Sequence, residues 1–191
     1  DAVEQHLQIA ERKSHISDKI KYKHFALATA HRAENVDDPN VLQSFVEAFV
    51  EAPIPLVYPV HPRTQRLLRQ IGLWKTLKSS DNVQVLPPLG YFDFLLLLKR
   101  CTMIITDSGG IQEEATAPAI RKPVLVIRLS TERPEAVNAG FAKVVGVKKE
   151  NILNEMNQTM KMRKELPDAS PYGDGHAAKK IVEILKRDRS S

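Results

Sequence analysis

The sequence is poor in the residues that form crosslinks, metal centres and membrane spans. It contains one cysteine, Cys101, which excludes internal disulfides and any zinc or iron–sulfur site built from several cysteines. A lone cysteine is typical of a reducing compartment, so we expect a cytoplasmic protein. The longest apolar run, Phe92 to Leu98, is interrupted by Asp93 and is far shorter than the ~20 residues of a membrane span. The sequence therefore predicts no membrane partner.

Several binding signatures are absent as well. Neither the GxxxxGK(S/T) loop of nucleotidases nor a GxGxxG fingerprint after the first strand is present, and the zinc motif HExxH is missing. Aromatic residues make up only 6% of the chain, and its 28 Lys and Arg are scattered among 23 Asp and Glu. Nucleic-acid binding needs a basic stripe with interleaved aromatics. We therefore expect no metal and no nucleic-acid partner, and the net charge of +5 favours anionic ligands only weakly.

The 191 residues, 42% of them hydrophobic, are enough for one globular domain with its own core. The chain begins with Asp1 instead of Met, and Val3, Leu7 and Ala10 already follow helical spacing. We therefore expect a fragment or a processed form.

Short apolar, β-branched runs alternate with helical stretches along most of the chain. Such runs are typical of parallel strands that helices cover on both faces. The alternation predicts an α/β fold, a Rossmann-like doubly wound parallel sheet of about six strands. The expected strands are residues 25–30, 54–60, 83–89, 103–108, 124–128 and 142–147. The expected helices are residues 40–51, 62–71, 91–99, 111–116, 134–139, 151–166 and 176–187.

Ligands of open parallel sheets bind at the carboxyl ends of the strands, so the residues that follow each strand belong together. After the fourth strand comes Ser108-Gly109-Gly110 at the start of a helix. Glycine lets backbone amides approach a phosphate closely, and the helix start offers amides that have no partner. One turn later, Glu113 or Glu114 could accept hydrogen bonds from both hydroxyls of a ribose. The alternative is that Ser108 caps the helix and the glutamates complement its dipole.

Two histidines also follow expected strands. His31 and Arg32 come after the first strand, and a guanidinium beside a histidine suits a pyrophosphate and a leaving oxygen. His61 follows the second strand and precedes Pro62. Both positions also fit ordinary surface loops, so the residues alone leave the choice open.

The motifs of these loops, taken together and in order, resemble the non-hydrolysing UDP-N-acetylglucosamine 2-epimerases. The similarity extends from about residue 25 to residue 185 and includes several long motifs at similar spacing. They are HRAEN, VHPRT, LPPLGYFDFLLLLK, TDSGGIQEEA, KPVLVIR, TERPEAVNAG and YGDG. Members of that family are two-domain proteins of the glycosyltransferase-B type, about twice as long. The resemblance implies that residues 1–191 form the carboxyl-terminal, UDP-binding half as a single domain. It also implies that helices in 151–187 pack toward a missing amino-terminal domain.

The resemblance implies a reaction and a set of ligands. The family interconverts UDP-GlcNAc and UDP-ManNAc by eliminating UDP, which leaves a 2-acetamidoglucal, and adding UDP back after protonation of the other face of C2. No cofactor is expected. By motif, Ser108, Gly109 and Gly110 would cradle the diphosphate, Glu114 would bind the ribose, and Phe94 would line the uracil pocket.

The remaining site residues would lie around the departing diphosphate. His31 is expected near its leaving oxygen as a catalytic residue. Arg32, His61, Glu132 and Arg133 would line the same cleft, and Arg32 and His61 could instead belong to a regulatory second UDP-GlcNAc site found in some bacterial members.

The resemblance also indicates what this sequence lacks. The family's acidic residues that move the C2 proton lie in the amino-terminal half, so we expect residues 1–191 to bind UDP without catalysis. The whole protein is expected to be a homodimer that serves polysaccharide biosynthesis. A UDP-sugar glycosyltransferase donor domain and a non-catalytic nucleotide-sugar binding module are the alternatives. Arg121 stands where the family usually has glycine, so the helix that ends there could be shaped differently.

Overall fold

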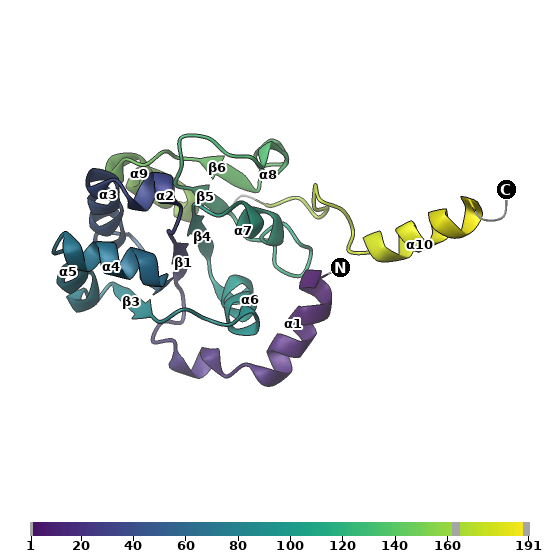
Figure 1. Ribbon diagram of the computed structural model, residues 1–191, viewed down its shortest axis with the longest axis horizontal. Coiled ribbons are helices and arrows are strands. Elements are labelled where there is room, and N and C mark those ends of the chain that lie inside the picture. The colour runs from purple at the N-terminus through teal and green to yellow at the C-terminus, as the bar shows by residue number, and fades with distance from the viewer. Residues whose placement is uncertain (1, 162–164, 189–191) are drawn as a thin grey trace.

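A computed structural model describes residues 2–161 and 165–188 of the chain (Figure 1). Its centre is a six-stranded, entirely parallel sheet in the order β3-β2-β1-β4-β5-β6. This is the strand order of the Rossmann fold, so the predicted fold class is confirmed. The strands are β1 (Ala26–Thr29), β2 (Leu56–Pro59), β3 (Val83–Leu86), β4 (Met103–Thr106), β5 (Val124–Val126) and β6 (Ala142–Val144).

Helices cover both faces of the sheet (Figure 1). One face packs against α2 (Ala33–Val36), α3 (Pro39–Val50), α4 (Pro62–Gln70), α5 (Trp74–Ser79) and α9 (Lys149–Lys161). The other face packs against α1 (Ala2–Lys13), a short 3-10 helix at Ile16–Lys19, α6 (Tyr91–Arg100) and α8 (Pro134–Asn138). A short helix, α7 (Gly109–Glu114), follows β4, and α10 (Ala177–Asp188) is the last described element.

The two apolar clusters explain why the strands read as unbroken apolar runs. In β1, Ala26 and Ala28 are buried in one cluster, while Leu27 is buried in the other. Successive side chains of a strand point to opposite faces, and here both faces are covered. The small alanines leave room for α3, whose Phe45 and Phe49 are buried against the same face.

Helix starts agree with the local sequence. The side chain of Asp38 accepts hydrogen bonds from the amides of Asn40 and Val41, at 2.8 and 3.5 Å, and Pro39 occupies the first turn of α3. The helices α2 and α5 and the 3-10 helix were not predicted. Each has only four to six residues, too few to show an apolar repeat of helical spacing.

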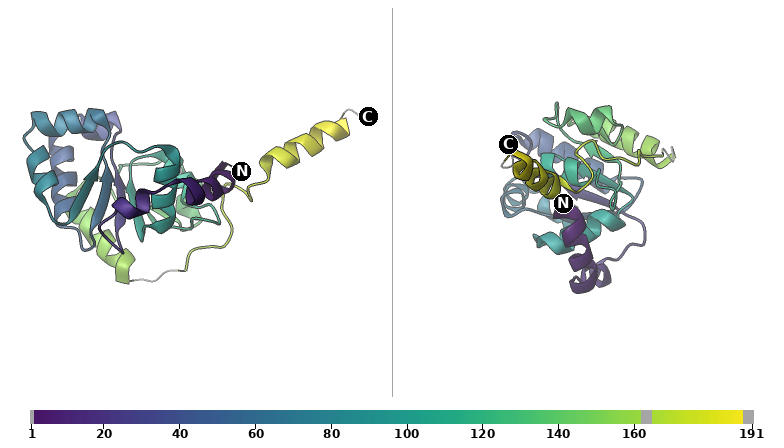
Figure 2. Two further views of the ribbon diagram at one scale, coloured as in Figure 1. Left: turned by 90° about the horizontal axis from the view of Figure 1, so that it is seen from below. Right: turned by 90° about the vertical axis from the view of Figure 1, so that its right-hand side faces the viewer.

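The predicted helix at 151–166 is wrong in its bounds. The observed helix α9 begins at Lys149 and is described to Lys161; residues 162–164 lie outside the described residues, and residues 165 and 166 are not helical. The helix predicted at 176–187 is confirmed within one residue as α10. In Figure 2, α10 extends away from the sheet and its covering helices.

Arg121 takes the backbone conformation that glycine favours. Its φ is +45°, which makes it the one non-glycine residue with positive φ in the described chain, at a cost of roughly 1–2 kcal/mol. Its guanidinium compensates by donating to the carbonyl of Leu166 at 2.5 Å and pairing with Asp168 at 2.9 Å. Arginine at this position therefore keeps the glycine-like turn and attaches the segment that leads to α10.

Cys101 follows α6 and is buried. Its thiol lies 3.2 Å from the carbonyl oxygen of Leu98 and donates a hydrogen bond to it. Burial raises the pKa of this thiol to about 12, so it stays protonated at neutral pH.

Candidate functional site

The strands β1 and β4 are neighbours in the sheet, although they are far apart in the sequence. Thr29 pairs with Thr106 at their carboxyl ends, where the two hydroxyl oxygens are 2.7 Å apart. The chain leaves β1 toward β2 on one side, and it leaves β4 toward β5 on the other side. Such a reversal of strand order is where open α/β sheets bind ligands. The loops that carry His31 and Ser108 therefore meet at the expected place.

Asp107 holds these two loops together. One of its carboxylate oxygens, Oδ2, accepts hydrogen bonds from the backbone amides of His31 at 2.9 Å and Arg32 at 2.8 Å. The same oxygen accepts from the side-chain amide of Asn35 at 3.2 Å, and that amide also donates to the carbonyl of Ile127 at 3.1 Å. The ends of β1, β4 and β5 are thus fixed relative to one another.

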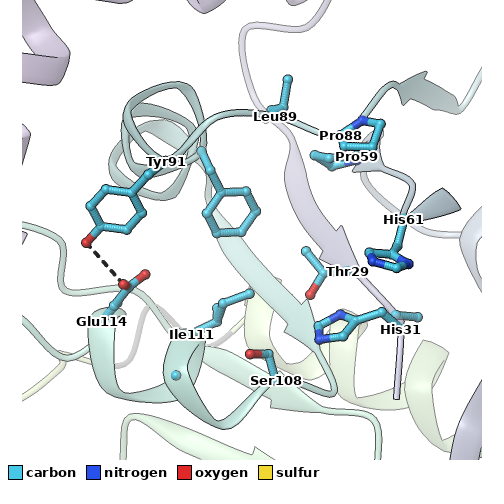
Figure 3. Close-up of a pocket in the computed structure, with 13 residues that line it drawn as sticks. Thr29, His31, Pro59, His61, Pro88, Leu89, Tyr91, Ser108, Ile111 and Glu114 are labelled. Carbon is cyan, nitrogen blue, oxygen red and sulfur yellow. Dashed lines mark hydrogen bonds between the residues drawn. The ribbon is translucent and has the colours of Figure 1, made fainter. Parts of the chain in front are cut away.

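A cavity of about 400 Å³ opens above this point (Figure 3). Loops and helix starts from β1, β2, β3 and β4 contribute to its wall. Six of the ten predicted site residues line it, namely His31, His61, Phe94, Ser108, Gly110 and Glu114. In Figure 3, the ring of His31 points toward Ser108, and Glu114 lies across the cavity next to Tyr91. The structure therefore brings together residues that are far apart in the sequence. His31 and Glu114, the two outermost of the six, are 83 positions apart.

The two histidines lie on adjacent loops at one side of the cavity. Their ring centroids are 6.1 Å apart. His61 precedes α4, and its Nδ1 accepts a hydrogen bond from the amide of Arg63 at 3.2 Å, so part of its function is to cap that helix. The side chain of His31 is 39% exposed, with one ring edge facing Asp107. Both histidines therefore line the cavity, with Nδ1 of His61 occupied by a backbone amide and Nδ1 of His31 facing Asp107.

The start of α7 is open toward the cavity. Ser108 occupies the capping position, but its side chain makes no capping hydrogen bond. Gly109 and Gly110 have no positive φ, and a Cβ would meet only ordinary contacts at Gly109 and no described atom within 4 Å at Gly110. The fold therefore does not require glycine at either position. At Gly110, the missing side chain leaves space on the cavity wall at a helix start, where the first amides have no partner within the helix.

Glu114 faces the cavity, and Glu113 does not. Tyr91 donates a hydrogen bond from its hydroxyl to Glu114 at 3.1 Å (Figure 3). Burial raises the pKa of Glu114 above its ordinary value, and burial beside this carboxylate raises the pKa of Tyr91 to about 12. Glu113 is paired with Arg133 instead. Of the two glutamates that the sequence offered for a ribose, the structure places only Glu114 on the cavity wall.

The other predicted residues lie beside the cavity. Arg32 pairs with Glu132 at 3.3 Å, and Glu132 also pairs with Arg128. The hydrogen bond from Arg128 is the main cause that lowers the pKa of Glu132 to about 2. Arg128 in turn donates to Glu34 at 2.7 Å. We call Arg32, Glu34, Arg128, Glu132 and the Glu113–Arg133 pair the charged network.

The sequence places Tyr91, Asp107 and Arg128 at or just after the ends of expected strands, but it assigns none of the three a role in the site. Tyr91 was known only as part of a loop motif, yet its hydroxyl bonds Glu114. Asp107 directly follows β4, Arg128 lies two residues after β5, and both are buried. A charged residue at the end of an apolar strand is the signal that could have identified them, because buried charges are retained only with partners.

The described residues contain neither a metal-binding cluster nor a membrane-spanning helix. Over residues 2–161 and 165–188, no group of three or more His, Cys, Asp or Glu side chains is arranged to hold a metal ion. Within the same ranges, none of the helices has the length and apolar character needed to cross a membrane.

Comparisons with known proteins place the chain in one family. Residues 1–186 match the family model for UDP-N-acetylglucosamine 2-epimerase. The UDP-N-acetylglucosamine 2-epimerase of Methanocaldococcus jannaschii is 35% identical over 193 residues, which cover 97% of this chain and 52% of that protein. A UDP-2,3-diacetamido-2,3-dideoxy-D-glucuronate 2-epimerase of Pseudomonas aeruginosa is 40% identical over 166 residues, covering 85% of this chain and 44% of the relative.

A solved structure shares the fold. The crystal structure of the M. jannaschii UDP-GlcNAc 2-epimerase in complex with UDP-GlcNAc and UDP superposes with a TM-score of 0.86 at 34% identity. The match covers 97% of this chain and 52% of that one. The chain thus spans about half the length of the curated relatives it matches.

Proposed function

Since the chain belongs to the UDP-N-acetylglucosamine 2-epimerase family, we propose that it is the UDP-binding half of an enzyme that interconverts UDP-GlcNAc and UDP-ManNAc. One observation carries this proposal. A single cavity at the reversal of strand order collects Ser108, Gly110, Glu114, Phe94 and His31, and these residue types suit the parts of a nucleoside diphosphate.

The diphosphate binds at the start of α7. The amides of Gly109 and Gly110 and the hydroxyl of Ser108 donate hydrogen bonds to its oxygens. Support comes from the hydroxyl of Ser108, which makes no capping hydrogen bond, and from the open space beside Gly110, where a Cβ would meet no described atom within 4 Å. A phosphate can approach a backbone only where no Cβ intervenes.

The uridine lies between α6 and the end of α7. Glu114 accepts hydrogen bonds from the ribose hydroxyls, and its ionised form is the stronger acceptor at both oxygens. Phe94, on the same cavity wall as Tyr91, packs against the uracil. The raised pKa of Glu114 fits a carboxylate that is held partly out of water until a ligand supplies hydrogen bonds.

His31 donates a hydrogen bond to the oxygen that leaves with UDP. Elimination across C1 and C2 places negative charge on that oxygen, so a donor aimed at it stabilises the transition state more than the substrate. The reaction also needs a base that removes the C2 proton and an acid that returns it. In this proposal the amino-terminal half of the same protein supplies both, so residues 1–191 bind UDP but do not catalyse epimerisation.

The complete protein is, in this proposal, a cytoplasmic two-domain enzyme that works as a homodimer in polysaccharide biosynthesis, with no nucleic-acid partner. Its amino-terminal half covers α10. The side chains of Ile181, Val182, Ile184 and Leu185 on α10 are 48–58% exposed, and α10 extends from the body (Figure 2). By contrast, Ile152 and Met156 of α9 are already buried in the core. An exposed apolar stripe of this kind is suited to a protein interface.

Two alternatives share the cavity. A UDP-sugar glycosyltransferase would use the same donor site with an acceptor instead of a proton relay, and a binding module would have no chemistry. The family match favours the epimerase over both. The sugar differs among the relatives, since the P. aeruginosa protein is named for a diacetamido uronate.

Calorimetry with residues 1–191 tests the binding site. We expect UDP to bind measurably, UMP more weakly and uridine weakest, because each step removes contacts to the start of α7. The affinity should fall well below that of the intact protein, since half a cleft leaves the ligand partly hydrated. Equal affinities for uridine and UDP would contradict the assignment of the diphosphate to Ser108, Gly109 and Gly110.

Solvent deuterium exchange tests the division of labour. Residues 1–191, saturated with UDP-GlcNAc in D₂O, should neither form UDP-ManNAc nor incorporate deuterium at C2, whereas the intact protein should do both. Proton NMR of the sugar follows both events. Exchange catalysed by residues 1–191 alone would show that the acid and base lie in this half.

A further inference from the structure

Asp107 is a fully buried carboxylate with an uneven set of partners. Its Oδ2 accepts the three N–H groups of His31, Arg32 and Asn35 described above. Its Oδ1 is also buried, and it has no hydrogen-bond partner among the described residues. A buried carboxylate oxygen without a partner is costly, so native proteins keep one only where it has a use.

The group that faces this oxygen is the imidazole of His31. The Nδ1 atom of His31 lies 3.4 Å from Oδ1 of Asp107. That distance is longer than a good hydrogen bond but short enough for a small rotation of the ring to form one. Hydrogen bonds of catalytic groups are often long before a ligand is bound and shorten in the complex.

We infer that Asp107 is a positioning residue for His31: it keeps the proton on Nδ1 and turns Nε2 toward the cavity. The inference rests on the proposed function, in which His31 contacts the departing oxygen of UDP. A carboxylate can only accept, so the nitrogen next to it must be the one that carries hydrogen. The ring edge that remains for the ligand is then Nε2.

The same carboxylate anchors the backbone of His31, so ring and main chain are fixed by one group. A ligand oxygen at the cavity therefore meets a nitrogen whose direction is set before binding. When that oxygen becomes negative, Nε2 must hold a proton to donate, and the negative charge of Asp107 stabilises the doubly protonated ring. This preorganisation is what makes a donor effective in a transition state.

The substitution Asp107→Asn separates the two functions of Asp107. Asparagine retains a carbonyl oxygen for the three N–H groups on the Oδ2 side, and it presents an NH₂ group to Nδ1 of His31. Because NH₂ is a donor, Nδ1 must become an acceptor, and the proton moves to Nε2. In residues 1–191 without ligand, nitrogen-15 NMR of the imidazoles should show His31 with Nδ1–H in the parent chain and with Nε2–H in the variant.

The chain provides a matched control. His15 and Asp18 form a second His–Asp pair, 4.0 Å apart between Nδ1 and Oδ2, but both side chains are more than 80% exposed. The substitution Asp18→Asn should leave the proton distribution of His15 unchanged, because water competes with an exposed carboxylate. The substitution His31→Gln assigns the His31 signals.

In the intact protein, Asp107→Asn should lower kcat by about 10–100-fold, the loss typical when the partner that orients a functional histidine is removed. The KM should change less than about threefold, since the contacts that bind substrate and transition state equally well are retained. If Asp107 had a purely structural function, the substitution would instead lower the stability of the protein and leave the tautomer of His31 unchanged.

Two results would overturn the inference. One is an Nε2–H tautomer of His31 in the unsubstituted chain, which is decisive even if the variant does not fold. The other is a folded Asp107→Asn variant in which His31 keeps Nδ1–H. Both are measured without ligand, so they are independent of the proposed function, which fails separately if the unsubstituted chain does not bind UDP.

Discussion

The two sides of the strand ends differ in how far their polar groups already satisfy one another. On the cavity side, Ser108 and Gly110 line the cavity, the Ser108 hydroxyl makes no capping hydrogen bond, and Glu114 accepts a hydrogen bond from Tyr91. On the other side, the charged network consists of ion pairs, among them Arg32 with Glu132 and Arg128 with Glu34. Both sides have residue types that bind anionic ligands. Only the first side leaves them available, so availability, more than residue type, marks the binding site.

The difference also concerns charge. Glu132 keeps its negative charge well below neutral pH because Arg128 lowers its pKa to about 2. The pKa of Glu114 is raised by burial, so its charge is less favourable. A ligand hydroxyl therefore gains more by bonding Glu114 than by competing with an arginine for Glu132. The predictions below use substitutions on the two sides to test this contrast.

The largest effect is expected from His31→Ala in the intact protein. The kcat should fall by about 10²–10³-fold, as when one donor to a developing negative charge is removed, while UDP affinity falls less than tenfold. Steady-state kinetics and calorimetry measure the two quantities. His24→Ala, an exposed histidine that precedes β1, is the control. Equal losses in kcat and affinity would mean that His31 only binds.

The substitution Glu114→Ala should weaken UDP by about 10–100-fold, because hydrogen bonds to a charged group contribute about 1.5–3 kcal/mol. Pyrophosphate binding should not weaken, since a carboxylate repels phosphate and helps only through the ribose. Calorimetry of residues 1–191 with both ligands is the measurement, and Glu113→Ala, on the charged side, is the matched control. If both ligands weaken alike, Glu114 acts on the shape of α7.

The substitution Gly110→Ala should lower UDP affinity about tenfold, the equivalent of one lost hydrogen bond to a charged group. A methyl group here has room in the fold but occupies the space beside the cavity. Thermal unfolding should show equal or slightly higher stability, since alanine is favoured over glycine in a helix. A large drop in the melting temperature would instead mean that the fold itself needs this glycine.

The smallest effect is expected from Glu132→Gln, on the charged side. Arg128 retains its ion pair with Glu34, and Arg32 loses only an exposed partner. The affinity for UDP should therefore change less than about threefold, toward tighter binding. Calorimetry at low and high salt measures it. A loss of tenfold or more would place Glu132 in contact with the ligand and remove the contrast between the two sides.

The fold was predictable because the strands are buried on both faces. Runs such as the one around Leu27 have no polar alternation, and their regular alternation with helical stretches favours a parallel sheet covered on both faces. The short helix α5 was not predictable, because its six residues are held mainly through Leu77 in the core. The end of α9 was placed wrongly because no glycine or proline marks it before Pro167.

The site was predictable in composition but not in arrangement. Ser108 and His31 follow strands, and the topology alone brings strand ends to one edge. The sequence could not separate Glu113 from Glu114, since adjacent residues of a helix point in different directions and the partner Arg133 comes from a distant loop. Nor could it show that Arg32 is paired with Glu132, because that contact depends on side-chain positions 100 residues apart.

The burial of Cys101 has a practical consequence for labelling. Maleimides and other thiol reagents need an accessible thiolate, and the one thiol of this chain is buried and protonated. The unsubstituted chain is therefore a background without a reactive handle. Within residues 1–191, a cysteine introduced at Ile184 would be the one site that takes up a fluorophore or a spin label. The spectrum of that label would report whether α10 is exposed in residues 1–191 and covered in the complete protein.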